Sequence, residues 1–389
     1  MQYHTIGEYQ ELLRKSGLLF ETKTEGSSDQ VIRILTYNSK EAGEDTLFIC
    51  KGAAFKPAYL REAVEKGAVC YISEKAFELE KDIPYILVTD IRKAMAILAN
   101  FFYQEPWKEL VVTGIGGTKG KSTSAYYMKA VVDDYMEAQG KKESAVISSI
   151  DIYDGVTKVE SHITTPEAME LQQHLRNALD SQITYAEMEV SSQALKYHRV
   201  DGMRFDVGIF LNISEDHISP IEHEDFEDYF SSKMLMFAQT DTAVVNLDAD
   251  HIERILEEAK AAKACVTFSL KNPEADYYGY NIRKDGHETT FSVKSKDFDE
   301  EFVLTMPGLF NVENALGVIA AASALQIPRE YIHSGLKRAR SSGRMELYAS
   351  KDKNVIAIVD YAHNKLSFEK LFSSMKEEYP DYGIVSIFG

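Results

Sequence analysis

A glycine-rich stretch, Gly114 to Ser122, has the clearest chemical potential in this sequence. It follows an apolar run and precedes a segment, Thr123 to Met136, that is expected to be helical. Glycines let backbone N–H groups turn toward one anion, and a helix N-terminus adds its positive dipole end. Lys121 would neutralise the outer phosphates of a nucleotide, and the Ser122 hydroxyl would bind Mg²⁺. The stretch predicts a phosphate-binding loop, although Ile115 stands where the common pattern has glycine. The alternative is a turn that only connects a strand to a helix.

Carboxylates follow two other predicted strands, at the sheet edge where ligands of parallel sheets bind. Glu189 lies at the end of the buried-type strand Ile183 to Val190, on the same edge as the glycine-rich stretch, where it could bind Mg²⁺. The alternative is a carboxylate that pairs with an arginine or caps the following helix. Asp360, at the end of the strand Val355 to Val359, is a second acid expected beside a nucleotide.

Three further residues are ambiguous on residue type alone. His217 follows the strand Phe205 to Asn212 and could bind a second cation or simply close a turn. Lys233 lies on an amphipathic helix, and by itself this predicts a solvated surface lysine. Arg344 is expected at a hinge between domains, from which a guanidinium could reach phosphates. The order of these residues along the chain is more informative than any one of them.

Composition excludes some classes of protein. The formal charge of −18 argues against a nucleic-acid-binding protein, which needs a basic face. Cys50, Cys70 and Cys265 lie far apart and outside any Cys-x-x-Cys spacing, which is typical of reduced, mostly buried thiols in a cytosolic protein. The sequence opens with no basic-then-apolar leader and contains no apolar run long enough to cross a bilayer. We therefore expect a cytoplasmic protein that acts on neither nucleic acid nor membrane.

The pattern of apolar runs divides the 389 residues into three α/β units, because the chain is too long for one ordinary domain. Residues 1–106 form a small unit, which ends at Pro106 because proline cannot continue the preceding helix. In residues 107–342 apolar strands alternate with helices, which predicts a parallel sheet covered on both faces. A hairpin around Asp285-Gly286 predicts an antiparallel edge on this sheet.

A third unit begins at residue 343. It contains the strand Val355 to Val359, a predicted helix at Lys365 to Glu377 and a second predicted strand at Gly383 to Phe388. The sequence stops where that second strand should continue into a loop. We therefore expect this unit, residues 343–389, to be incomplete.

Seven motifs, in this order, resemble those of the Mur ligase family and, within it, of the UDP-N-acetylmuramoyl-tripeptide synthetases. They are Gly-Thr-Lys-Gly-Lys-Ser (117–122), Thr-Thr-Pro (164–166), Glu-Val-Ser-Ser (189–192), Asn-Ile-Ser-Glu-Asp-His (212–217), Phe-Asn-Val-Glu-Asn (310–314), Gly-Arg-Met-Glu (343–346) and Asp-Tyr-Ala-His-Asn (360–364). The family's own loop lacks a glycine at the place of Ile115. The resemblance implies a small UDP-binding domain, a central ATP-binding domain with a parallel sheet, and the start of a Rossmann-like domain that binds an amino acid.

The resemblance also implies the cofactors, which are ATP and two Mg²⁺ ions. The residues that it places at the nucleotide are Gly117, Thr118, Lys119, Gly120, Lys121, Ser122, Thr123, Asn311, Asn314, Arg344 and Asp360. The implied metal ligands are Ser122, Glu189, His217 and Lys233, the last as a carbamylated lysine. Carbamylation turns a cation into an anion that can lie near both metals, and it requires a neutral amine. Lys121, Glu189, His217 and Lys233 are the implied catalytic residues.

A second implied set binds the UDP-linked muramoyl peptide. It consists of Ser39, Lys51, Gly52, Thr164, Thr165, Ser191, Tyr197 and Arg199. Ser39 matches a serine that binds uridine, and Tyr197 stands where many relatives have a glutamine. Lys119 replaces a frequent asparagine, as in a subset similar to the L-lysine-adding enzymes of some Gram-positive bacteria.

The implied reaction is ATP-dependent amide formation on UDP-N-acetylmuramoyl-L-alanyl-D-glutamate through an acyl phosphate, by a protein that is expected to be monomeric. L-Lysine is favoured as the added amino acid and meso-diaminopimelate is the alternative, since the selecting motif is expected beyond Gly389. Three other functions stay open. They are another ligase of the superfamily, such as a folylpolyglutamate synthetase, a generic ATPase or switch, and a truncated nucleotide-binding module without turnover.

Overall fold

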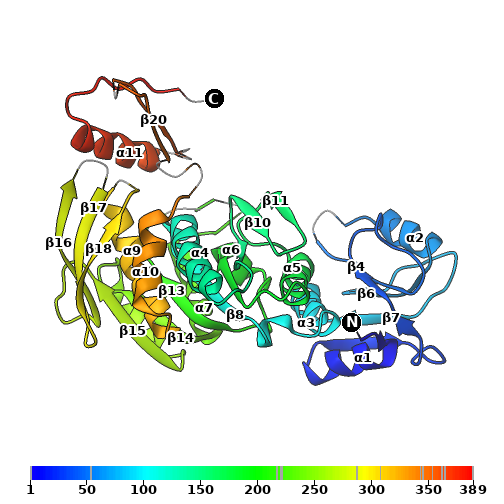
Figure 1. Cartoon of the computed structure of the whole chain (residues 1–389). Coiled ribbons are helices and arrows are strands. Elements are labelled where there is room, and N and C mark those ends of the chain that lie inside the picture. Colours follow the sequence, from blue (N-terminus) through cyan, green and yellow to red (C-terminus); the bar gives the residue numbers. More distant parts are fainter. Residues whose placement is uncertain are drawn as a thin grey trace.

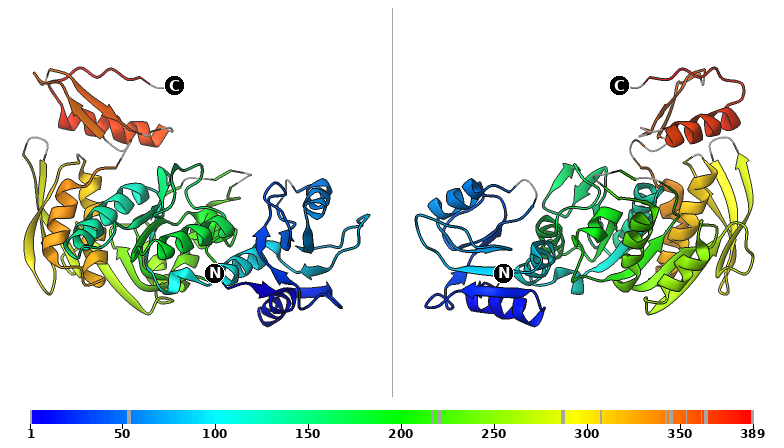
Figure 2. Two further views of the ribbon diagram at one scale, coloured as in Figure 1. Left: turned by 45° about the vertical axis from the view of Figure 1, so that its right-hand side comes forward. Right: turned by 180° about the vertical axis from the view of Figure 1, so that it is seen from behind.

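The structure of the protein is a computed structural model, which describes residues 2–52, 55–215, 218–219, 222–285, 288–306, 308–341, 343, 346–352, 354–360, 362 and 365–387. Figure 1 shows three bodies: a sheet with helices near the N-terminus, a large central sheet, and a small unit near the C-terminus. Figure 2 shows from two further directions that the first and last bodies lie at different ends of the central one. Among the described helices none is both long and apolar enough to cross a membrane.

The first body is a five-stranded sheet with the strand order β2-β7-β6-β5-β4. Its strands are β2 (Leu19–Lys23), β4 (Ile34–Thr36), β5 (Thr46–Ile49), β6 (Ala68–Ser73) and β7 (Tyr85–Val88), and β1 (His4–Thr5) pairs separately with β3 (Val31–Ile32). The helices are α1 (Ile6–Lys15), α2 (Pro57–Glu65) and α3 (Ile91–Phe102). Strands β4 to β7 run parallel, so the residues that follow them share one sheet edge. The helix predicted before Pro106 is confirmed, and it is α3.

The central body is an eleven-stranded sheet with the order β11-β10-β9-β12-β8-β13-β14-β15-β16-β17-β18. The strands are β8 (Val111–Gly116), β9 (Ala145–Ile147), β10 (Asp151–Tyr153), β11 (Lys158–Glu160), β12 (Tyr185–Glu189), β13 (Phe205–Phe210), β14 (Thr240–Asn246), β15 (Ala264–Ser269), β16 (Tyr277–Asp285), β17 (Glu288–Lys294) and β18 (Asp299–Leu304). From β9 to β16 all neighbours are parallel, as the alternating pattern predicts. The predicted antiparallel edge is confirmed, because β16, β17 and β18 pair antiparallel.

Helices cover both faces of the central sheet. They are α4 (Lys121–Ala138), α5 (Ala168–Asp180), α6 (Ser192–Lys196), α7 (Phe226–Ala238), α8 (Ile252–Ala259), α9 (Leu309–Ala324) and α10 (Arg329–Arg338), with a short 3₁₀ turn, η1 (Pro106–Lys108). Side chains alternate along each strand, so one strand supplies both faces. On β14, Val244 packs with α4 and α9, whereas Ala243 and Val245 pack with α7 and α8. A strand buried on both faces must be apolar throughout, which explains the continuous apolar runs of the sequence.

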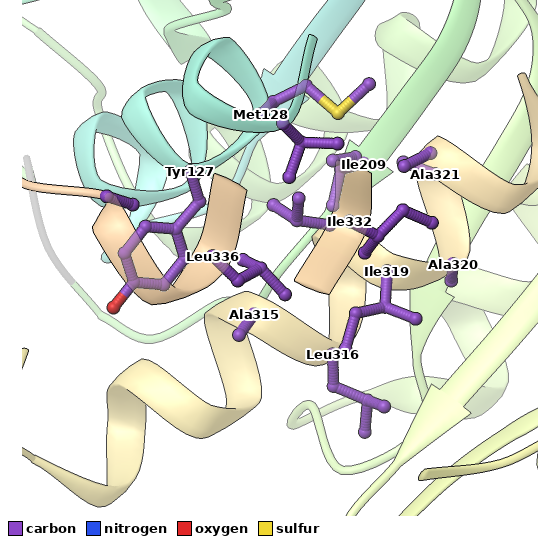
Figure 3. Close-up of a cluster of buried hydrophobic side chains, with 14 of the residues drawn as sticks. Tyr127, Met128, Ile209, Ala315, Leu316, Ile319, Ala320, Ala321, Ile332 and Leu336 are labelled. Carbon is purple, nitrogen blue, oxygen red and sulfur yellow. The ribbon is translucent and has the colours of Figure 1, made fainter. Parts of the chain in front are cut away.

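The core on one face lies between α4, α9 and α10, as Figure 3 shows. Tyr127 and Met128 from α4 belong to one cluster with Leu336 and Ile332 from α10 and with alanine side chains of α9. Helices α4 and α10 approach closely because Gly335 has no side chain, and a Cβ there would overlap the backbone of Val131. This packing fixes the position of α4, the helix that follows the glycine-rich stretch.

The first body is joined to the central one through α3 and α5. Ala168 and Met169, at the start of α5, are buried in the apolar core of the first body. Asn100 on α3 donates from Nδ2 to the carbonyl oxygen of Asp201 at 3.0 Å and accepts from Trp107 Nε1 at 2.8 Å. We call this junction the seam. Its buried contacts hold the carboxyl edge of the first sheet next to the start of α5.

The last body consists of β19 (Glu346–Ala349), β20 (Ile356–Val359) and α11 (Lys365–Glu378), with β19 and β20 antiparallel. The strand predicted at 355–359 and the helix predicted at 365–377 are confirmed. The strand predicted at 383–388 is wrong for the described residues 383–387, which form no strand. Val385 and Ile387 are largely exposed. An apolar run adopts a buried strand only when neighbouring strands and helices cover it, and the described part of this body provides no such cover.

Candidate active site

The glycine-rich stretch forms a tight loop between β8 and α4. Gly117 has a φ of +140° and Gly120 a φ of +91°, backbone conformations that favour glycine. A Cβ at Gly120 would also overlap the side-chain amide of Asn314 on α9. Ile115 still belongs to β8 and is buried in the core between α4, α9 and α10. Glycine is not needed there, because the loop begins two residues later.

Asn212, which follows β13 on the same sheet edge, fixes the loop. Its side-chain oxygen accepts from the backbone N–H of Thr118 at 3.2 Å and from that of Lys119 at 2.9 Å. Its Nδ2 donates to the carbonyl oxygen of Lys119 at 3.0 Å. The Thr118 hydroxyl is also fixed, because it lies 2.9 Å from the Tyr229 hydroxyl and accepts from the N–H of Ser214 at 3.1 Å. The N–H groups of residues 118 and 119 therefore point to Asn212, and the anion-binding N–H groups must be those at the start of α4.

The start of α4 lies at the carboxyl edge of the sheet. The first backbone bond of the helix is donated by Ser124 N–H to the carbonyl oxygen of Gly120 at 2.9 Å. Lys121, Ser122 and Thr123 form the first turn of the helix, where the backbone N–H groups point toward its N-terminal end. Such groups, together with the helix dipole, suit a phosphate. The predicted anion site is thus built by the helix start more than by the loop itself.

Two lysine ammonium groups converge on one loop carbonyl. Lys121 Nζ donates to the carbonyl oxygens of Gly117 and Thr118, both at 3.1 Å. Lys233 Nζ, from α7, donates to the same Gly117 oxygen at 2.8 Å. Two cations that share one acceptor attract an anion strongly, and more so away from bulk water.

The expectation that Lys233 is a solvated surface residue is wrong. Its exposed fraction is only 3%, and its Nζ lies 4.8 Å from the centre of the Tyr229 ring. Helix α7 packs apolar side chains, including Phe230 and Met234, under the sheet on both sides of this lysine. The helix is therefore buried around most of its circumference, which an amphipathic pattern does not indicate.

Oxygen atoms suited to Mg²⁺ meet beside the helix start. Ser122 Oγ lies 3.0 Å from Ser149 Oγ, and the buried carboxylate of Glu189 accepts from the Ser149 N–H at 2.8 Å and from its hydroxyl at 3.1 Å. The predicted edge is confirmed, because β12 and β8 pair in parallel with Glu189 opposite Ile115. Serine and carboxylate oxygens are hard donors that fit Mg²⁺. Among the described residues no three His, Cys, Asp or Glu side chains form a metal cluster. Phosphate and water would therefore complete the shell.

Of the other residues predicted to bind the nucleotide, some lie near the loop, one lies in the last body and two are outside the described residues. Asn311 and Asn314 are buried on α9, with Asn314 packed against Gly120. Asp360 follows β20 in the last body, which stands apart from the loop in Figures 1 and 2. His217 and Arg344 lie outside the described residues.

The predicted uridine-binding residues share one edge of the first sheet. Ser39 follows β4, and Lys51 and Gly52 follow the parallel neighbour β5. Ser39 donates from Oγ to Glu62 Oε2 at 2.7 Å, and its carbonyl accepts from Lys66 at 2.9 Å. Gly52 has a φ of +98° with open space where a Cβ would lie. Parallel sheets bind ligands at this edge, which agrees with the predicted position of the UDP pocket.

The predicted peptide-binding residues of the central body lie at the seam. The Thr165 hydroxyl donates to the carbonyl oxygen of Glu189 at 2.8 Å and accepts from the N–H of Ser191 at 3.1 Å. Arg199 donates from Nη1 to the carbonyl oxygen of Thr165 at 3.1 Å. Thr164 is half-buried beside them, and the Tyr197 ring lies 4.4 Å from the Arg92 guanidinium. Thr165 therefore connects the substrate side directly to the strand that carries Glu189.

Ser192, His223 and Asp228 form a hydrogen-bonded series. His223 Nε2 lies 2.9 Å from Ser192 Oγ, and its Nδ1 lies 3.0 Å from Asp228 Oδ2. The order resembles a nucleophilic triad, but His223 is fully buried, and burial lowers its pKa despite the Asp228 carboxylate. A buried imidazole cannot serve an incoming substrate. We interpret the series as a tie between α6 and α7.

Three residues of the site were not assigned a role from the sequence: Asn212, Ser149 and Glu167. Asn212 and Ser149 each lie two residues after a strand of the central sheet, and Glu167 directly precedes α5. This position was the available signal. Their types are common in turns and caps, so residue type alone does not distinguish a site residue from a structural one.

Comparisons with known proteins agree with this geometry. Residues 115–322 match the family described as the Mur ligase middle domain. A protein of Streptococcus pneumoniae named UDP-N-acetylmuramoyl-L-alanyl-D-glutamate--L-lysine ligase is 36% identical over 374 residues, which cover 93% of this chain and 73% of that protein.

Solved structures share the fold. A structure of a UDP-N-acetylmuramoyl-L-alanyl-D-glutamate--2,6-diaminopimelate ligase has a TM-score of 0.79 at 21% identity and covers 96% of this chain and 74% of its own. The MurF ligase of Thermotoga maritima in complex with ADP has a TM-score of 0.61 at 18% identity, with coverages of 88% and 74%. At these identities the likeness concerns the fold alone.

Proposed function

The chain belongs to the Mur ligase family, and from this premise we propose that it is an ATP-dependent UDP-N-acetylmuramoyl-tripeptide synthetase. Its substrates would be UDP-N-acetylmuramoyl-L-alanyl-D-glutamate, ATP and an amino acid, with L-lysine favoured over meso-diaminopimelate. The name of the Streptococcus pneumoniae relative supports L-lysine. The proposal extends to a cytoplasmic, monomeric enzyme of peptidoglycan precursor synthesis.

One observation carries the proposal. Lys121 and the start of α4 concentrate positive charge at the same sheet edge where Ser122 and Glu189 offer oxygen ligands. A site of this kind suits the triphosphate of ATP with Mg²⁺. The seam, with Lys51 and Arg199, lies on the other side of Thr165 and suits an anionic second substrate.

The reaction requires two anions to meet. A side-chain carboxylate oxygen of the D-glutamate residue attacks the γ-phosphorus of ATP, a new P–O bond forms, and the bond to ADP breaks. The amine of the amino acid then attacks the acyl carbon, phosphate leaves, and the amine loses a proton. Lys121 would hold the outer phosphates and lower the repulsion between the two anions. Mg²⁺ held by Ser122 and Glu189 would add further charge neutralisation. His217 is proposed as a ligand of a second ion.

Lys233 is proposed to be carbamylated in the active enzyme. Its position fits, because a buried amine next to a backbone carbonyl is far from bulk water, where an ammonium is best solvated. A carbamate there would place a negative charge close to the loop and to the proposed Mg²⁺ sites. The nucleotide residues Asn311, Asn314, Arg344 and Asp360 stay part of the proposal. For Asp360, the last body must approach the loop during turnover.

Phosphate release is the test. We expect release only when ATP, Mg²⁺, UDP-N-acetylmuramoyl-L-alanyl-D-glutamate and L-lysine are all present, with meso-diaminopimelate as the matched comparison for the amino acid. Faster release with meso-diaminopimelate would replace L-lysine in the proposal. Release that is equally fast without the UDP-linked peptide would defeat the ligase proposal in favour of a simple ATPase.

A further inference from the structure

Glu167, the residue before α5, binds two cationic side chains with its two carboxylate oxygens. Oε2 lies 2.6 Å from Lys51 Nζ, and Oε1 lies 3.1 Å from Arg199 Nη2. Lys51 comes from the first body and Arg199 from the central body, so the carboxylate spans the seam. The exposed fractions of the three side chains are only 10% for Lys51, 13% for Arg199 and 18% for Glu167.

The cluster keeps a net positive charge. Besides Lys51 and Arg199, the guanidinium of Arg92 also acts on the Glu167 carboxylate. The carboxyl group of Glu170 interacts with both Lys51 and Glu167, so three cations face two carboxyl groups. Burial alone would raise the pKa of Glu167, but the bond from Lys51 and the charges of all three cations lower it below its usual range. The carboxylate is therefore ionised at neutral pH, and the surplus of cations leaves the seam attractive to a further anion.

The cations are held in place, but not all of their N–H groups have hydrogen-bond partners among the described residues. Lys51 Nζ lies 4.4 Å from the centre of the Tyr37 ring, and the Tyr37 hydroxyl donates to Glu170 on α5. Arg199 uses Nη1 and Nη2, but its buried Nε has no hydrogen-bond partner among the described residues. A buried guanidinium N–H without a partner is costly unless a ligand satisfies it.

We propose that Glu167 is a positioning residue, whose carboxylate holds Lys51 and Arg199 in one cradle for an anionic group of the UDP-linked substrate. The inference rests on the proposed function and adds a residue to it. A buried ion pair is weak evidence for stability, because apolar residues of similar volume often do as well. This charged cluster lies where the carboxyl edges of the first and central sheets meet. A role in binding an anion explains it better, because preorganised cations lose less entropy when the anion binds.

The experiment compares wild type with Glu167→Gln, which keeps the shape of the side chain and removes its charge. We expect the KM for UDP-N-acetylmuramoyl-L-alanyl-D-glutamate to rise about tenfold, because the two cations repel each other and separate. The kcat and the KM for ATP should stay within about twofold. Asp180→Asn, which breaks the exposed pair with Arg176 at the other end of α5, is the matched control and should leave all three constants unchanged. An unchanged or lower KM in Glu167→Gln overturns the inference.

A double-mutant cycle with Lys51→Ala tests positioning directly. If Glu167 acts through Lys51 and Arg199, Glu167→Gln should raise the KM less in the Lys51→Ala background than in wild type. Additive effects would mean that the two residues act separately, and the inference would fall. Should Glu167→Gln unfold, as judged by circular dichroism, Glu167→Asp in the same cycle keeps the charge and should give a smaller rise in KM than Lys51→Ala. A rise as large as that of Lys51→Ala overturns the inference.

Calorimetric titration separates this inference from the proposed function. Wild type that binds none of the UDP-linked ligands overturns the proposed function and the inference with it. Wild type that binds, while Glu167→Gln binds equally well, overturns the inference alone. Titration with UDP and with the full UDP-linked peptide identifies the anion: weaker binding of both by Glu167→Gln assigns the cradle to the diphosphate, and weaker binding of the peptide alone assigns it to the peptide carboxylates.

Discussion

The two ends of the candidate site are built in different ways. At the loop, neighbouring residues of one segment present backbone groups, and Asn212 fixes them from the next strand. At the seam, side chains from two separate sheets meet at Glu167. The loop therefore depends on local backbone geometry, whereas the seam depends on how the first and central bodies pack.

This difference has a kinetic consequence. Changes at the loop should act on ATP and on turnover, and changes at the seam should act on the UDP-linked substrate. Thr165 is the direct connection between them, because its hydroxyl bonds the strand that carries Glu189. Substitutions at the loop and at the seam test this division.

Lys121→Ala should have the largest effect. Removing a cation aimed at the developing charge should lower kcat by roughly 10³-fold, with little change in the KM for the UDP-linked peptide. Phosphate release measured at saturating peptide tests this. A kcat close to that of wild type would show that the loop does not hold the reacting phosphates.

Lys233→Ala should lower kcat by roughly 10²-fold, because the proposed carbamate near the Mg²⁺ sites is lost. Formate or another short carboxylate should restore part of the activity by replacing the missing anion. Lys260→Ala, an exposed lysine after α8, is the control and should neither lose activity nor respond to formate. Full activity of Lys233→Ala without formate would remove the carbamate from the proposal.

Asn212→Ala should raise the KM for ATP by roughly tenfold, because three bonds that shape the loop are lost and each contributes about 1 kcal/mol or less. The KM for the UDP-linked peptide should not change. Asn212→Asp keeps an acceptor for the two N–H groups but adds negative charge beside the phosphates, so it should be worse than alanine for ATP. Equal effects on both substrates would contradict a division between the two ends.

Glu187→Gln should change stability alone. Glu187 lies two residues before Glu189 on β12, is fully buried, and has no hydrogen-bond partner among the described residues. Burial, with the nearby Asp133 charge, raises the pKa of Glu187 from 4.5 to about 8. The native state therefore keeps a proton that the unfolded state loses above pH 4.5. Stability falls as pH rises from 5 to 8, by up to about 1.4 kcal/mol per pH unit.

Thermal unfolding at several pH values checks this sign. The melting temperature of Glu187→Gln should exceed that of wild type by a margin that grows from pH 5 to pH 8, with both KM values unchanged. A margin that does not depend on pH would mean that Glu187 does not titrate in this range. Glu187 lies on the same strand as Glu189, so Glu187→Gln also serves as a control for changes in β12 that affect stability but not substrate binding.

The parallel sheet, its antiparallel edge and the edge that carries the site could be predicted from the sequence, because all three follow from local patterns. Apolar runs with helices between them specify parallel strands, and the residues after such strands must meet at one edge. This reasoning brought Gly117, Ser122 and Glu189 together correctly. The position of Ile115 in the core also explains why the departure from the common loop pattern has no structural cost.

The features that could not be predicted from the sequence depend on contacts between distant segments of the chain. The burial of Lys233 requires α7 to lie under the loop, and the pairing of Lys51 with Arg199 requires two sheets to dock. The failed strand at 383–388 has the same origin, because its neighbours decide whether an apolar run becomes a strand. The domain boundaries at 106 and 342 and the roles of His217 and Arg344 stay predictions.

Gly120 has an evolutionary consequence. A side chain at this position is excluded for two reasons. The backbone φ angle of Gly120 favours glycine, and the amide of Asn314, almost two hundred positions later in the chain, occupies the space that a Cβ would need. A mutation that shortened Asn314 would make room but would not relieve the backbone, so no single change elsewhere can free this position to vary. Lineages that descend from this chain should keep Gly120 for as long as they keep the loop.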